Sequence, residues 1–236
     1  MRLVLASSNA KKLGEMRALF APLGLECLSC AELGISEPHE PHRSFIENAL
    51  VKARHAARHA ACAAIADDSG LCVDALGGAP GVDSANYAAI ERPQADNIRR
   101  PSPEGVKETW GGPAFPCELP LAEREVQRRA QDQANNVLLL QRLRGIADRR
   151  AHFVSALVAL RNADDPEPLV AVGRWEGEIL DAPRGSGGFG YDALMFIPAL
   201  GKTVAELVGE EKNRFSHRAL AAQRMLLAVR ESWHLA

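Results

Sequence analysis

Apolar and polar positions follow two periodicities that alternate along the chain. Short apolar runs predict strands, and apolar residues three or four positions apart predict helices. Strands are expected at 2–6, 25–30, 63–66, 71–73, 151–160, 169–175 and 193–197. Helices are expected at 11–23, 44–61, 121–144, 203–208 and 216–231. The pattern therefore predicts an α/β protein.

Two local signals refine this prediction. Ser44 and Glu47 have the spacing of a capping box, which marks the start of a helix. The strands at 151–160 and 169–175 flank a short polar turn and predict a β-hairpin. Because a hairpin adds antiparallel pairing, we expect an elongated mixed sheet with flanking helices. A doubly wound nucleotide-binding fold is the alternative.

Prolines and glycines concentrate at about 89–120. Six prolines fall between residues 92 and 120, which disfavours regular helices and central strands there. We interpret this stretch as a long surface insertion. The 236 residues otherwise suit one domain, or two lobes that share a core, over 1–236.

Composition limits the partners of the chain. A formal net charge of -2 and a pI near 6.4 provide no long-range attraction for nucleic acid or an anionic membrane. A polyanion must then be held by a local pocket, which favours a small ligand. Five cysteines, an odd number, favour a reducing compartment over a disulfide framework. Because no apolar run reaches the ~18 residues of a membrane span, we expect a cytoplasmic protein.

A small, polar and basic turn joins the first expected strand to the first expected helix. It consists of Ser7, Ser8, Asn9, Ala10, Lys11 and Lys12. Unpaired backbone N–H groups at a helix N-terminus attract anions, and two lysines strengthen that attraction. The turn is therefore a candidate phosphate site. An ordinary helix cap with solvated lysines is the alternative.

The acidic pair Asp67 and Asp68 follows the apolar run at 63–66, and we expect it at a break between two strands. Burying carboxylates is costly unless a cation or hydrogen-bond donors meet them. Mg²⁺ suits such oxygen ligands, and a carboxylate beside it can act as base on an attacking water. The alternative is an Asx turn without a metal.

The glycine-rich segment at 185–190 matches the letters of a dinucleotide-binding fingerprint. That motif requires a helix directly afterwards, whereas a strand is expected here. We therefore interpret the segment as a loop in which Phe189 offers a stacking face to a base, or else a turn with Phe189 in the core. Lys212, His217 and Arg218 place basic groups near the start of the last helix, where an anionic or electron-rich ligand would compensate them. The alternative is a solvated basic surface.

Six segments, in one order and spacing, resemble the inosine triphosphate pyrophosphatase family of non-canonical purine triphosphate pyrophosphatases. They are LASSNAKK at 5–12, SFIENALVKAR at 44–54, ADDSGL at 66–71, GGAPGV at 77–82, GGFGYD at 187–192 and SHR at 216–218. The resemblance spans about residues 3–229. One departure is Asn86, where the family usually has arginine.

The resemblance implies an elongated mixed sheet with two lobes around a central cleft, and a homodimer. Mg²⁺ would lie at Glu40 and Asp68, and the catalytic residues would be Asp68, the proton acceptor, and Lys52. The 7–12 turn and Lys212 would hold the triphosphate. Other substrate-binding residues would be Ser69, Phe189, Gly190, Tyr191, Asp192, His217 and Arg218.

The implied reaction is hydrolysis of dITP, ITP or XTP to the monophosphate and pyrophosphate. Donors near Arg218 would select the purine 6-oxo group, because a 6-amino group would leave a buried donor unpaired. Two alternatives stay open. One is a related pyrophosphatase for modified pyrimidine nucleotides, and the other is a nucleotide-binding relative without turnover.

Overall fold

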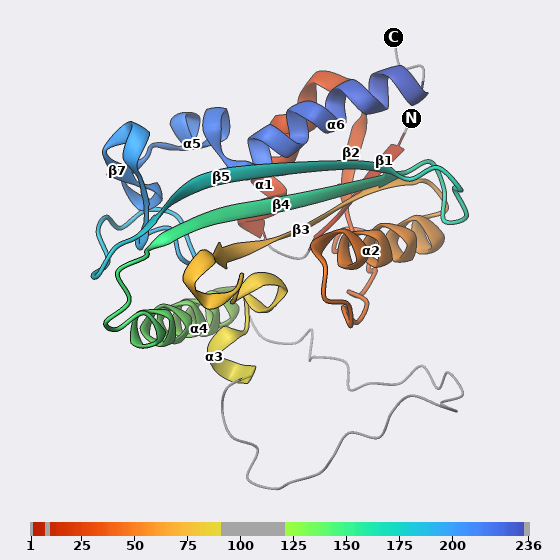
Figure 1. Ribbon diagram of the computed structural model, residues 1–236. Coiled ribbons are helices and arrows are strands. Elements are labelled where there is room, and N and C mark those ends of the chain that lie inside the picture. The colour runs from red at the N-terminus through yellow and green to blue at the C-terminus, as the bar shows by residue number, and fades with distance from the viewer. Residues whose placement is uncertain (1, 8–9, 91–120, 234–236) are drawn as a thin grey trace, which may run out of the picture.

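A computed structural model describes residues 2–7, 10–90 and 121–233 (Figure 1). Its centre is a seven-stranded sheet in the order β2-β1-β3-β4-β5-β6-β7. The strands are β1 (Arg2–Ala6), β2 (Glu26–Ser29), β3 (Ala63–Val73), β4 (Arg150–Leu160), β5 (Leu169–Ile179), β6 (Met195–Ile197) and β7 (Lys202–Thr203). β1 runs parallel to β2 and β3, and the other pairs are antiparallel. The predicted mixed α/β sheet is confirmed, and the doubly wound alternative is wrong.

Helices cover both faces of this sheet. They are α1 (Ala10–Phe20), α2 (Phe45–Ala60), α3 (Tyr87–Ile90), α4 (Leu121–Arg142), α5 (Gly209–Phe215) and α6 (His217–Trp233). Figure 1 shows α1, α5 and α6 on one face and α2, α3 and α4 on the other. We call these the α6 face and the α2 face.

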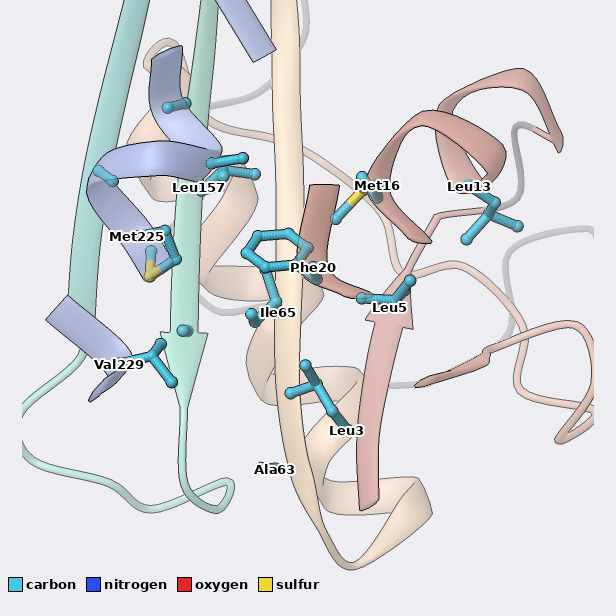
Figure 2. Packing of buried hydrophobic residues seen from close by; sticks show 14 residues of the cluster. Leu3, Leu5, Leu13, Met16, Phe20, Ala63, Ile65, Leu157, Met225 and Val229 are labelled. Carbon is cyan, nitrogen blue, oxygen red and sulfur yellow. The ribbon is translucent and has the colours of Figure 1, made fainter. Parts of the chain in front are cut away.

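Separate hydrophobic clusters lie on the two faces. On the α6 face, Phe20 of α1 and Met225 of α6 pack over Leu3, Leu5 and Ile65 of the sheet (Figure 2). On the α2 face, the buried apolar residues of α2 are all alanines, namely Ala49, Ala53, Ala56 and Ala57, and the partly buried Leu50 packs against their cluster. Because alanine side chains are short, the backbone of α2 can lie close to the sheet.

The start of α2 confirms the predicted helix start at Ser44, although the Glu47 carboxylate accepts the Ser44 hydroxyl at 2.7 Å in place of the reciprocal backbone bond of a capping box. Ser44 is the N-cap, and its hydroxyl oxygen accepts the Glu47 backbone N–H at 3.3 Å. The helix is thereby fixed at its N-terminal end, which places the next turns, including Lys52, under β3.

A third cluster lies toward the other end of the long strands. Leu71 and Val73 of β3 pack there with Phe153 of β4, Trp175 of β5 and Leu139 of α4. The residues between the cores on β3, at 67–70, are polar or glycine. The acidic pair therefore lies between hydrophobic cores.

The prediction of a strand break at the acidic pair is wrong. β3 is one continuous strand of 11 residues, and Asp67 and Asp68 pair with Leu157 and Ala156 of β4. The pairing partner is far away in sequence, so the local polar pattern indicated a turn where the sheet imposes a strand.

The prediction of a helix at 203–208 is also wrong, because Lys202–Thr203 forms strand β7 and only Val204–Glu206 forms a single 3₁₀ turn. Other boundaries differ less. The hairpin is confirmed and its second strand runs on to Ile179, whereas the strand expected at 193–197 is only β6. The helix α5 was not predicted. Residues 91–120, most of the expected insertion, lie outside the described residues, and 89–90 belong to α3. No helix in the described part of the chain is long and apolar enough to cross a membrane.

Candidate active site

The candidate site is centred on β3 just beyond the point where β1 ends. The pairing of these strands stops at Ala6 and Ala66, while β3 continues to Val73. Successive side chains of a strand point to opposite faces. Accordingly, Asp67 contacts residues of α1 and α6, and Asp68 contacts residues of α2. The acidic pair is thus divided between the two faces of the sheet.

On the α2 face, two carboxylates share one amine. Lys52 Nζ lies 2.9 Å from Asp68 Oδ1 and 2.8 Å from Glu40 Oε2. Asn48 holds the same region together, because its amide donates to Asp68 Oδ2 at 3.4 Å and its Oδ1 accepts the backbone N–H of His42 at 3.0 Å. The predicted metal ligands and Lys52 therefore meet at one point.

Burial and charge shape the ionisation of this group. Burial raises the pKa of Asp68 above that of an ordinary aspartate, and nearby Glu40 adds to the rise, although Lys52 opposes it. Burial would lower the pKa of Lys52, but its two carboxylate partners reverse this and raise it. Lys52 is therefore an ammonium at neutral pH, and Asp68 is a stronger base than a solvated aspartate.

The donor set fits a divalent cation. Two carboxylates against one ammonium leave an excess of negative charge on the α2 face. Among the described residues, no group of three or more His, Cys, Asp or Glu side chains could enclose a metal by itself. Mg²⁺ commonly takes one or two carboxylates and completes its shell with water and substrate phosphates. Glu40 and Asp68 match that requirement.

On the α6 face, Asp67 is surrounded by donors. Lys12 Nζ lies 3.1 Å and Arg218 Nε 3.6 Å from Asp67 Oδ2. The hydroxyl of Ser69 donates to Oδ2 at 3.0 Å, and that of Ser155 to Oδ1 at 2.6 Å. Burial alone would raise the pKa of Asp67, but the two cations and Ser155 outweigh burial and hold it well below the ordinary range. Asp67 is therefore a permanent anion.

A second set of charges continues from Arg218. Glu15 of α1 contacts the Arg218 guanidinium and lies 3.4 Å from Lys212 Nζ. Lys212 Nζ also lies 2.9 Å from Asp192 Oδ2 and 4.6 Å from the centroid of the Phe189 ring. Lys212 thus connects residues 187–192, the glycine loop, to the charged network of the α6 face.

Three other side chains expected to bind substrate, those of His217, Tyr191 and Phe189, have different surroundings. His217 is buried and stacks on Phe153 with ring centroids 4.9 Å apart. Burial, aided by the charge of Arg218, lowers the pKa of His217 well below that of a free histidine, so the ring is neutral. Tyr191 packs in the core, where its hydroxyl donates to Ser84 O at 2.9 Å. Phe189 is only partly buried and can face a ligand.

Most of the predicted site residues come together around β3. Ser7 is buried where β1 ends, and Ser69 receives a hydrogen bond of 3.1 Å from Arg218 Nη2. Ser8 and Asn9 lie outside the described residues, as do the side chains of Ala10 and Lys11. These assignments therefore stay predictions.

Sequence reasoning missed two acids of the network. Asp67 was recognised as half of an acidic pair but received no role, and Glu15 was overlooked. Glu15 lies one turn after Lys12, so it shares that lysine's side of α1. This spacing was the available signal for Glu15.

Comparison with known proteins agrees with the resemblance. The model of the Ham1 family matches residues 3–105 and 120–228. A protein of Methylibium petroleiphilum named dITP/XTP pyrophosphatase is 60% identical over 99% of both chains. One of the same name from Leptothrix cholodnii is 56% identical over 100% of both chains.

Solved structures give the same result. A HAM1 protein from Coxiella burnetii has a TM-score of 0.76 and 33% identity, covering 98% of this chain and 100% of its own. A nucleoside-triphosphatase / dITP/XTP pyrophosphatase from Mycobacterium abscessus has a TM-score of 0.63 and 35% identity, covering 97% and 98%. The predicted family is confirmed: this chain belongs to the Ham1 family.

Proposed function

We propose that the chain hydrolyses non-canonical purine nucleoside triphosphates, such as dITP and XTP, to the monophosphate and pyrophosphate. The observation that carries this proposal is the division of charge at β3. A carboxylate pair suited to a divalent cation lies on one face, and a cluster of lysines and an arginine lies on the other. The names of full-length relatives up to 60% identical support the same substrates.

Glu40 and Asp68 would hold Mg²⁺. When bound, the cation would neutralise phosphate charge and polarise the attacked phosphorus. The excess negative charge of this group supports the assignment. Lys52 would keep the two carboxylates in place, because its amine lies within 2.9 Å of both.

Asp68 would accept a proton from the attacking water. The water oxygen bonds to the α-phosphorus, the bond from that phosphorus to the α–β bridging oxygen breaks, and pyrophosphate departs with the electron pair. The position of Asp68 supports this role, because its carboxylate lies 2.9 Å from the Lys52 ammonium and beside the proposed cation, where an attacking water would lie. Lys52 would stay protonated and stabilise the negative charge that develops.

Lys12 and Lys212 would bind the phosphates together with the 7–12 turn. Both ammonium groups are paired with carboxylates, Lys12 with Asp67 and Lys212 with Asp192 and Glu15. A triphosphate would share these cations, and the partial positive charge at the N-terminus of α1 would add to its attraction.

Arg218, His217 and Phe189 would recognise the base. Arg218 is buried, and its guanidinium contacts Glu15, Ser69 and Asp67. A 6-oxo group would share these donors, whereas an adenine amine would oppose donor to donor. Phe189 would stack on the base, with its ring already beside Lys212.

Three broader expectations belong to this proposal. The chain would form one two-lobed domain over 1–236 with an insertion at about 89–120, which the separate hydrophobic cores along one sheet support. It would act as a homodimer. It would work in the cytoplasm, where a nucleotide pool is available.

A substrate panel tests the proposal. Release of pyrophosphate from dITP, XTP, dGTP, dATP and dTTP should be measured with and without Mg²⁺. Turnover of dITP and XTP that requires Mg²⁺ and far exceeds that of dATP is expected. Preference for thymidine or modified pyrimidine nucleotides would favour the pyrimidine alternative. Binding of dITP with no pyrophosphate released would identify a non-catalytic relative.

A further inference from the structure

The glycine loop, residues 187–192, is held by a helix outside the charge network. The backbone N–H of Gly190 donates to Asp132 Oδ2 of α4 at 2.8 Å. The side-chain amide of Asn136, one turn further along α4, donates to Gly190 O at 3.0 Å. Both backbone groups of one loop residue are therefore bound by one helix.

This loop needs an external anchor. Gly188 and Gly190 have φ angles of 74° and 60°, in the left-handed region that glycine enters freely. Glycines in sequence give the loop many alternative conformations. Phe189 lies between the two glycines, so its ring direction depends on how they are held. Asp192 adds two bonds within the loop: its Oδ2 accepts the Phe189 N–H at 3.0 Å, and its backbone N–H donates to Phe189 O at 3.2 Å.

The same face of α4 also holds a second segment. Asn135 donates to Ser84 O at 3.2 Å and to Ala85 O at 3.0 Å, and accepts the Ala88 N–H at 2.9 Å. Ser84 in turn accepts the Leu71 N–H at the end of β3, at 2.9 Å. Helix α4 therefore connects the glycine loop to the strand that carries Asp68.

We propose that Asp132 and Asn136 are positioning residues that fix the Phe189 ring for stacking on a purine. The inference rests on the function proposed above and extends it to the affinity for the base. Asp132 is the stronger anchor, because a carboxylate that accepts a backbone N–H forms a charge-assisted bond. Neither residue touches the substrate, and both act through Gly190.

The test compares variants along α4. Asp132→Ala removes the acceptor, Asp132→Asn keeps an acceptor oxygen, and Asn136→Ala removes the donor on the carbonyl side. Gln133→Ala is the matched control, because Gln133 is an exposed residue of the same turn. KM and kcat should be measured for dITP and dATP with Mg²⁺, along with the Kd of inosine monophosphate and the melting temperature.

Loss of one such bond should raise KM for dITP and the Kd of inosine monophosphate by about fivefold to tenfold in Asp132→Ala. The kcat should stay nearly unchanged, since binding and not the chemical step is affected. KM for dATP should rise by a similar factor, because an aromatic ring stacks on either purine. Asn136→Ala should show a smaller effect in the same direction, Asp132→Asn should recover most of the affinity, and Gln133→Ala should match the wild type.

A lower melting temperature with unchanged KM and Kd in folded Asp132→Ala and Asn136→Ala would overturn the inference and leave a structural role only. If Asp132→Ala does not fold, Asn136→Ala and Asp132→Asn decide the question by the same readouts. Failure of the proposed function gives a different result: the wild-type protein itself would not cleave dITP.

Discussion

The two faces of β3 carry adjacent aspartates in opposite electrostatic settings. On the α2 face, Asp68 and Glu40 share the single ammonium of Lys52. On the α6 face, Asp67 is fully buried and meets Lys12 and Arg218 with two hydroxyl donors. The group around Asp68 has one positive charge for two carboxylates, whereas the negative charge of Asp67 is balanced by its cationic partners.

This difference shows how one strand can serve two ligands of opposite charge. The deficit of positive charge on the α2 face suits a cation. On the α6 face, three cations balance three carboxylates, and an arriving polyphosphate can share those cations. Because β1 ends beside the pair, both faces border the same edge of β3, just beyond its pairing with β1. Asp68 should therefore be essential for turnover, and Asp67 for the structure.

The largest effect is expected for Asp68→Asn. The amide keeps the shape of the side chain but is not a base, so kcat for dITP should fall by about 10²–10⁴-fold. Steady-state pyrophosphate release measures this loss, and circular dichroism should show an unchanged fold. Near-wild-type turnover in a folded protein would contradict the assignment of Asp68 as the proton acceptor.

Asp67→Asn should act mainly on stability. The change leaves Lys12 and Arg218 without their shared buried anion, and breaking a buried pair costs about 3–5 kcal/mol. We expect about 3 kcal/mol, the lower end of that range, because Lys12 can turn toward solvent and Ser155 can still donate to the amide oxygen. Urea unfolding measures the change.

Asp148→Asn provides the matched control for that experiment. Asp148 pairs with Arg150 on the surface, where solvent weakens ion pairs. Its removal should leave the unfolding midpoint unchanged. Equal destabilisation by Asp67→Asn and Asp148→Asn would show that the buried ion pairs of Asp67 stabilise the fold no more than an exposed ion pair does.

Metal binding should distinguish the two faces without any turnover. At a Mg²⁺ concentration of 100 times Kd, wild-type protein should gain about 2.7 kcal/mol of stability. Glu40→Gln should remove most of this gain, whereas Asp67→Asn should retain it from its lower starting point. Thermal unfolding with and without Mg²⁺ measures both. A gain in stability that vanishes in Asp67→Asn but persists in Glu40→Gln would place the cation on the α6 face and contradict its assignment to Glu40 and Asp68.

Sequence patterns indicated which residues belong to the candidate site better than they indicated how those residues are arranged in space. The capping pattern at Ser44 and the alanines of α2 fixed the helix that carries Lys52, because these signals are local. The division of Asp67 from Asp68 could not be predicted, since it depends on pairing of β3 with β4 across about 90 residues of chain. Asp132 could not be predicted either, because nothing in the sequence distinguishes it from the many other charged residues of α4.

The smallest expected effect concerns pH. Burial lowers the pKa of His217. Below pH ~6.5, histidine in the unfolded chain therefore binds a proton that His217 in the folded protein does not bind. Stability is therefore complete above that pH and declines as pH falls, by at most about 1.4 kcal/mol per pH unit. The charged groups that act on His217 are Arg218, Asp67, Lys212 and Lys12.

His217→Phe should reduce this decline between pH 6.5 and 5, a window set by the lowered pKa of His217. The phenyl ring can keep the stacking on Phe153, and it removes an Nδ1 that has no hydrogen-bond partner. His55, whose pKa burial also lowers, is present in both proteins and cancels in the comparison. Urea unfolding at several pH values measures the slopes. Identical slopes would mean that the folded protein accepts the proton on His217, and that the α6 face tolerates one more positive charge than its balanced network implies.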